Sequence, residues 1–203
     1  MKKSIVMLLA VATVASCNKK NTVADENAVT QTETSTTADS GSMIGDSATT
    51  SDTAQQSSSL SDQDKKFADA AAKGGMMEVM AGELAAKSAT NSTVKTLGQM
   101  MVKDHTKAND ELKQWATQNN YTLPSGLDAD QQKKFDELKT KKGAEFDRMY
   151  TAQMVSDHQK TIADFKKQAA EGSETSLKAF ATKTLPTLEH HLMESKKAKN
   201  AVK

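Results

Sequence analysis

The four histidines of the chain offer its most specific chemistry. Two of them close the same motif, Met-Val-x-Asp-His, which occupies residues 101–105 and recurs 53 residues later at 154–158. A neutral imidazole is a ligand for zinc, copper, iron or manganese, and burying it without a partner is unfavourable. The repeated motif therefore suggests a metal site, provided that the fold brings the two copies together.

Three of the four histidines fall on apolar stripes of segments with helical periodicity. A helix buries residues that recur at spacings of three and four, which predicts that His105, His158 and His191 face inward and that His190 turns away. The three stripes are Val94, Leu97, Met101, His105, Ala108, Leu112 and Trp115; Phe146, Tyr150, Met154, His158, Ile162 and Phe165; and Leu177, Phe180, Thr184, Leu188, His191, Ser195 and Ala198.

A fourth stripe, near the start of the helical region, carries one acid. Its members are Phe67, Ala71, Gly74, Glu78, Ala81 and Ala85. Residue counts from the intervening turns place Glu78 level with His105, and His158 level with His191, to within about one and a half turns. Burying this set is unfavourable unless its members pair with one another or with an ion. We therefore predict a site for one transition-metal ion, which the sequence does not resolve among zinc, copper, iron and manganese.

The residues beside the two motif histidines have two interpretations each. Asp104 and Asp157 lie about 100° around the helix from the histidine that follows, so each is either a hydrogen-bond acceptor for an imidazole on an adjacent helix or a solvated flank residue. Met101 and Met154 lie one turn before the histidines on the same stripes. They are either soft ligands that favour copper(I) or ordinary core residues.

The elements that must position these residues are four long helices and one short helix. Period, caps and breaks predict helices at about 61–90, 92–119, 129–141, 144–170 and 174–200, the third being the short one. Pro186 falls inside the last helix. No stretch alternates with period two for long enough to predict a strand. The expected fold is all-α, an up-down four-helix bundle with a short extra helix between the second and third long helices.

The first residues of the chain predict export. A basic start, an apolar run and small residues indicate a signal peptide over 1–16. Cys17, the single cysteine of the sequence, follows Val-Ala-Ser and resembles the lipidated residue of a bacterial lipobox. Asn18 at the next position favours the outer membrane. We therefore expect a cell-envelope lipoprotein that contacts a membrane through Cys17 and faces the periplasm or the surface.

A tether follows the predicted anchor. Of the 43 residues from Asn18 to Leu60, 17 are Ser or Thr and none is aromatic, so this stretch cannot bury enough apolar surface to fold. Residues 17–60 are expected to link Cys17 to a helical domain at 61–203. The chain's 27 basic and 26 acidic residues nearly balance, which argues against nucleic-acid binding.

Four segments, one on each long helix, resemble a known family. The segments are Gly74–Val79; Met101–Asn109; Phe146–Tyr150 with Met154–His158; and Leu185–Leu188 with His191–Leu192. They resemble the family catalogued as domain of unknown function 4142, over about residues 62–198. The resemblance implies an exported or outer-membrane protein with a ferritin-like helical bundle and an unsettled activity.

The resemblance also invites comparison with ferritin-like di-iron enzymes, whose bundles carry Glu-x-x-His on two helices. Here the residues three before His105 and His158 are Val102 and Val155. With one clear carboxylate on the stripes, a single-ion site is the more sensible expectation.

Two function classes follow from these features. One is a lipid-anchored envelope protein that binds a transition metal inside its bundle for storage, buffering or sensing. The other is a structural or interaction module, with unidentified protein partners, whose buried Glu/His layer fixes helix register without metal. A pH switch built on the same histidines is a further alternative. We do not expect an enzyme, because the sequence offers no Ser/His/Asp, Cys/His or phosphate-loop arrangement.

Overall fold

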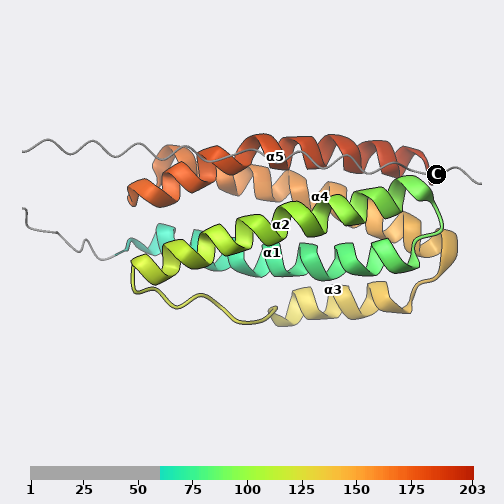
Figure 1. The fold of residues 1–203 in the computed structure, drawn as a ribbon, viewed down its shortest axis with the longest axis horizontal. Helices are drawn as coiled ribbons and strands as arrows, with labels where there is room; N and C mark the ends of the chain where they lie inside the picture. Colours follow the sequence, from blue (N-terminus) through green and yellow to red (C-terminus); the bar gives the residue numbers. More distant parts are fainter. Residues whose placement is uncertain (1–59) are drawn as a thin grey trace, which may run out of the picture. The chain divides into compact units, whose positions relative to one another are not determined.

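The computed structural model describes residues 60–203, which form five helices (Figure 1). They are α1 (Asp62–Ser88), α2 (Ser92–Gln118), α3 (Ala129–Thr140), α4 (Gly143–Glu171) and α5 (Thr175–Asn200), and the described part of the chain contains no strand. The predicted all-α four-helix bundle with a short extra helix is confirmed, with helix ends within two residues of the predicted ones. Pro186 lies inside α5.

Local capping explains why the helices begin where they do. The side chain of the residue before the helix accepts a hydrogen bond from a backbone N–H of the first turn in four of the five helices. For α3 this is a capping box between Asp128 and Gln131. The capping residues are Ser61, Asn91, Asp128 and Glu174.

The bundle consists of two antiparallel hairpins. α1 pairs with α2 and α4 with α5, while α1 also packs on α4 and α2 on α5, so that α2 and α4 lie on a diagonal. The segment with α3 runs back along α1 (Figure 1), and α4 therefore starts at the end of the bundle where α1 stops. Contacts between Asp147 of α4 and the α1–α2 turn confirm this placement. As a result α2 and α4 run in the same direction, and both copies of the repeated motif point the same way. The order of the long helices thus departs from the alternating up-down order that the sequence predicted, because the 119–142 segment crosses the length of the bundle.

Two apolar clusters fill the bundle, one toward each end. One contains Phe67, Leu112, Trp115, Phe165 and Phe180. The other contains Leu97, Met101, Phe146, Tyr150 and Met154. Along each long helix, the predicted ligand falls between a residue of one cluster and a residue of the other, as His158 does between Met154 and Ile162. The predicted ligands thus form a polar layer in the middle of the bundle.

Close contact between α1 and α2 fixes part of this layer. A Cβ atom added at Gly82 would lie 2.8 Å from the carbonyl oxygen of Gly98, and one at Gly98 would lie 2.7 Å from that of Gly82. Only glycine allows the two backbones to approach this closely. Because Gly82 is one turn from Glu78, this contact holds the Glu78 backbone close to α2.

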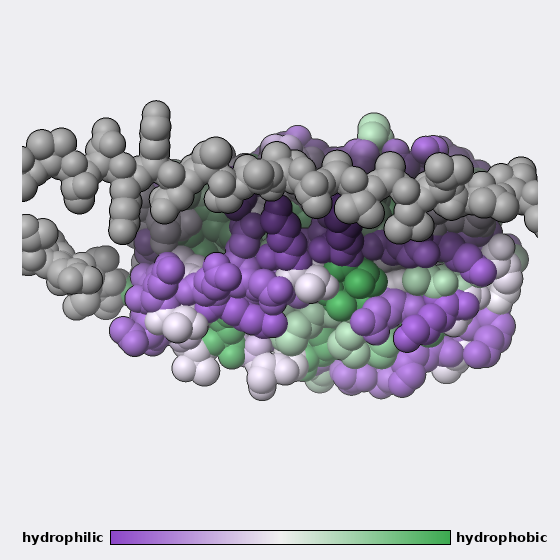
Figure 2. All heavy atoms as spheres, in the orientation of Figure 1, coloured by the Kyte–Doolittle hydropathy of each residue, from purple (hydrophilic) through white to green (hydrophobic). Residues whose placement is uncertain are grey.

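The outer surface is largely hydrophilic on the face that Figure 2 shows, with smaller apolar areas between charged side chains. Among residues 60–203, no helix combines the length and apolar character that crossing a membrane requires. The predicted signal peptide, Cys17 and nearly all of the predicted tether lie outside the described residues.

Candidate metal centre

Three histidines from three helices meet in the polar layer. His105 of α2, His158 of α4 and His191 of α5 each place a ring nitrogen within 4.8 Å of the other two. All three side chains are at most 8% exposed, and their ring centres are 5.1 to 5.6 Å apart. His190 is exposed, as its position off the stripe predicts. The structure thus brings together three of the four predicted ligands.

Hydrogen-bond partners define the tautomers of two of these rings. The Nδ1 atom of His158 lies 2.9 Å from the carbonyl oxygen of Met154, which can only accept, so Nδ1 carries the proton. The Nε2 atom of His191 lies 3.0 Å from a carboxylate oxygen of Asp104 and donates in the same way. In the neutral rings, the remaining nitrogens, His158 Nε2 and His191 Nδ1, then carry lone pairs. These two atoms face each other at 3.3 Å.

This spacing suits a shared metal ion. Ligand nitrogens at about 2.0–2.1 Å from a tetrahedral zinc ion lie about 3.3–3.4 Å apart. Two facing lone pairs repel each other, and a cation between them would turn that repulsion into attraction. The Nε2 atom of His105 is buried and has no hydrogen-bond partner anywhere in residues 60–203. The histidine cluster therefore contains a third ring with an unpartnered nitrogen.

Burial also keeps the three imidazoles in the form that binds metal. It lowers the pKa of His105 well below the usual value of 6.5, and the positive charges that His158 and His191 would carry lower it further. It lowers the pKa of His158 to about 4. The pKa of His191 is also lowered by burial, although the Asp104 carboxylate opposes the shift. All three rings are neutral near pH 7, so no proton competes with a metal ion.

Glu78 lies beside the histidines rather than among their ligand nitrogens. Its Oε1 atom is 3.9 Å from His158 Nδ1, the nitrogen that already donates to Met154. Its Oε2 atom is buried with no hydrogen-bond partner in the described chain. Burial raises the Glu78 pKa to about 8, and the nearby charge of Asp157 adds to the shift. Near pH 7 this acid is therefore mainly protonated in the metal-free protein.

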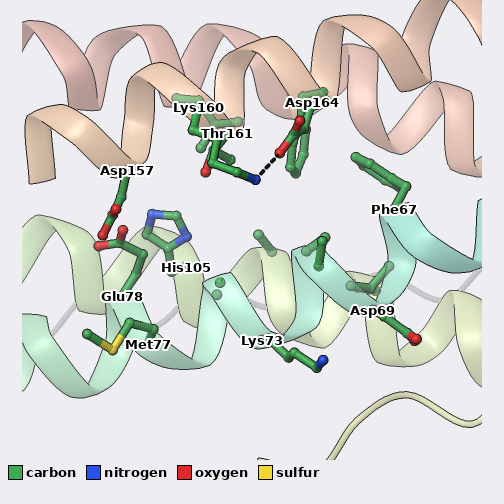
Figure 3. A pocket seen from close by; sticks show the side chains of 18 of the residues that line it. Phe67, Asp69, Lys73, Met77, Glu78, His105, Asp157, Lys160, Thr161 and Asp164 are labelled. Atoms are coloured by element: carbon green, nitrogen blue, oxygen red, sulfur yellow. Dashed lines mark hydrogen bonds and ion pairs between the residues drawn. The ribbon is translucent and has the colours of Figure 1, made fainter. Parts of the chain in front are cut away.

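The two motif aspartates have different neighbours. Asp104 contacts His191 on the adjacent helix α5, the arrangement that orients an imidazole for metal binding. Asp157 points toward Glu78 instead (Figure 3). Its histidine neighbour in sequence, His158, is oriented by the backbone of Met154.

The two motif methionines are fully buried. Met101 and Met154 both belong to the apolar cluster around Phe146 and Tyr150. Their side chains thus pack as core residues, and Met154 additionally supplies the carbonyl oxygen that orients His158.

Two buried acids of this fold were not among the predicted site residues. Asp64 accepts hydrogen bonds from the Gln168 side chain at 2.6 Å and from the backbone of Ser173 and Glu174 at 3.2 Å each. Asp147 accepts from the backbone of Thr90 and Asn91. Each acid lies three residues before a stripe aromatic, and that helical phase was a signal for its burial.

The fold has a solved relative. CopM in the Cu(II)-bound form superposes with a TM-score of 0.59 over 68% of this chain and 96% of that chain, at 17% sequence identity. At this identity the similarity concerns the fold alone. No curated protein matches the chain in sequence.

The family resemblance is confirmed over a larger part of the chain than the quoted segments. Residues 49–198 match the family described as Domain of unknown function (DUF4142). This match covers more than half of the sequence and includes α1 to α4 and nearly all of α5. The chain belongs to the DUF4142 family.

Proposed function

We propose that this protein binds one transition-metal ion in the middle of its bundle, through His105, His158 and His191. The observation that carries the proposal is the 3.3 Å contact between His158 Nε2 and His191 Nδ1. The acceptors on the far side of each ring, Met154 O and Asp104, hold the protons away from this contact. The unpartnered His105 Nε2 atom adds a third donor to the site.

Copper and zinc are the first ions to test. Neutral imidazoles bind both, and copper(II) binds nitrogen sites more tightly than the other common divalent ions. The fold similarity to CopM, whose solved form contains Cu(II), supports placing copper first. Glu78 borders the site on the side of His158 Nδ1, the ring nitrogen that donates to Met154 rather than facing His191.

The proposed role is binding rather than catalysis, such as storage, buffering or sensing of the ion. We further propose that the protein acts in the cell envelope, anchored through a lipid on Cys17. The basic start, apolar run and Val-Ala-Ser-Cys sequence of the N-terminus support this placement.

Elemental analysis of the protein, purified without a chelator or a histidine tag, tests the proposal. His191→Ala and His190→Ala form a matched pair, because the two histidines are adjacent and only His191 is buried. The wild type and His190→Ala should retain about one equivalent of one metal, and His191→Ala should lose it while circular dichroism shows an intact bundle. Equal retention in the two variants would overturn the proposal. So would a wild type that stays empty after incubation with copper, zinc, iron and manganese.

One contact also favours the non-metal alternative. If His191 were doubly protonated, it could donate to Asp104 and to His158 at once, since both partners are within 3.3 Å. The layer would then fix helix register by hydrogen bonds alone. The lowered pKa of the buried His191 ring argues against this protonated form near pH 7.

A further inference from the structure

A cavity of about 910 Å³ leads from the surface to the histidines. Residues of α1, α4 and the start of α3 form much of its wall, and Glu78, His105 and His158 are among its lining residues. Charged side chains such as Lys73 and Asp164 also line it (Figure 3). The cavity is therefore a water-accessible approach to the candidate metal centre.

Two carboxylates face each other where this cavity meets the histidine cluster. Glu78 reaches inward from α1, and Asp157 reaches toward it from α4 (Figure 3). Glu78 is only 6% exposed, and its Oε2 atom has no hydrogen-bond partner within the described residues. Glu78 is buried and Asp157 half-buried, and holding two carboxylates side by side away from water is unfavourable unless a proton or a cation compensates their charge.

Lysines also line this cavity. Lys134 and Lys160 are among its lining residues, and Lys160 forms an ion pair with Asp164 at 2.7 Å. Within residues 60–203, no donor forms a hydrogen bond with the Oε2 atom of Glu78. A buried carboxylate oxygen at the inner end of the cavity is thus left without a partner.

We propose that Glu78 and Asp157 form a second cation site, built from carboxylate oxygens, at the inner end of the cavity. Oxygen ligands suit harder divalent cations such as Mn²⁺, whereas the three imidazoles prefer copper or zinc. This site goes beyond the proposed function, because its ligands are not histidines. An ion that enters through the cavity would meet the carboxylates as it reaches the imidazoles. The pair would thus bind the ion first and pass it to the three histidines.

Titration of the purified protein with Mn²⁺, followed by the electron paramagnetic resonance of the free ion, tests this site. Asp157→Asn and Glu78→Gln remove one ligand each without a large change of shape. Asp164→Asn is the matched control, since it removes an acid from the same cavity two turns along α4. His191→Ala shows whether the Mn²⁺ site depends on the triad.

The wild type, Asp164→Asn and His191→Ala should each bind about one Mn²⁺. Asp157→Asn and Glu78→Gln should bind it at least about 10-fold more weakly, because losing even a hydrogen-bond partner of a ligand weakens binding by about 10- to 100-fold. Unchanged binding in both carboxylate variants would overturn the proposal. Loss of Mn²⁺ in His191→Ala would place the ion in the triad instead. No Mn²⁺ binding by the wild type would mean that the two acids share a proton only. None of these outcomes depends on whether the triad retains copper or zinc.

Discussion

Buried carboxylates occur in two settings in this bundle, and their surroundings differ. Toward opposite ends, Asp64 and Asp147 each accept hydrogen bonds from the turn between two helices of the other hairpin. In the middle, Glu78 is almost as deeply buried, but its Oε2 atom meets no donor from residues 60–203. Burial alone raises the Asp64 pKa, yet hydrogen bonds from Ser61, Gln168, Ser173 and Glu174 lower it overall. The Glu78 pKa rises to about 8.

The hydrogen bonds of Asp64 and Asp147 give these two acids a structural role, whereas the unpartnered oxygen of Glu78 indicates a ligand-binding role. Buried polar groups in folded proteins are nearly always hydrogen-bonded, so an unpartnered one needs an explanation. Around Glu78 the buried Nε2 atom of His105 and the hydroxyl of Tyr150 also lack partners in the described chain. Such a group of unsatisfied atoms, beside a cavity, is typical of a site completed by an ion or water.

The largest predicted effect is the loss of stability when one of the hydrogen-bonded buried acids is replaced. Asp147→Ala should destabilise the bundle by about 3 kcal/mol or more, because the backbone N–H groups of Thr90 and Asn91 and the Thr90 hydroxyl lose their acceptor. Urea denaturation measures the change. Asp164→Ala, which removes an acid from an exposed ion pair, is the control and should cost about 1 kcal/mol or less. Equal losses in both variants would contradict a special role for Asp147.

Metal binding to the middle layer should change the unfolding free energy by a slightly smaller amount. At a free copper or zinc concentration 100 times the dissociation constant, the unfolding free energy should rise by about 2.7 kcal/mol. Thermal melts with and without a chelator measure this change. His191→Ala should show none of it, whereas Asp64→Asn, though less stable, should keep the full metal-dependent increment. A chelator-insensitive wild type would contradict this prediction.

The pH dependence should have opposite sign at the two kinds of acid. The folded state of Glu78 holds its proton up to about pH 8, whereas the ordinary value is 4.5, so the unfolding free energy falls as pH rises through this window. In metal-free protein, Glu78→Gln should remove that fall. The lowered pKa of Asp64 contributes stability above its ordinary value of 3.8 that is lost as pH decreases. Identical pH profiles for the wild type and Glu78→Gln would contradict the assignment.

The smallest predicted effect concerns the aspartate that orients His191. Asp104→Asn should weaken metal binding about 10-fold, because the amide can turn its nitrogen toward His191 and no longer fixes the tautomer. Competition with a calibrated chelator measures the affinity. Asp110→Asn, on the exposed side of the same helix, is the control and should leave the affinity unchanged. The opposite ranking of the two variants would be inconsistent with the proposed site.

The helices and the inward histidines could be predicted because they depend on local signals. Caps such as Ser61 and Asp128 fix helix ends within a few residues, and the stripe spacing identifies which side of each helix is buried. The direction of α4 depends on how far the 119–142 segment travels, which local pattern does not define. Because this segment crosses the length of the bundle, α2 and α4 are parallel and both motif histidines lie in one layer.

Side-chain partners across the bundle were less predictable than burial. Asp104 and Asp157 hold the same place relative to their histidines, yet one contacts His191 and the other faces Glu78. Which neighbour each meets depends on the rotation of the helices about their axes. The contacts of Asp64 join residues more than 100 positions apart, so no local pattern indicates them.

The most direct test of the metal centre is nitrogen NMR of the histidine rings, with and without zinc. The metal-free protein near pH 7 should have protons on His158 Nδ1 and His191 Nε2 and none on the two facing nitrogens. The resonances of those facing nitrogens should shift when one equivalent of zinc is added. A doubly protonated His191 that bridges Asp104 and His158, with spectra unaffected by zinc or copper, would contradict the proposed metal centre and favour a metal-free layer that fixes helix register.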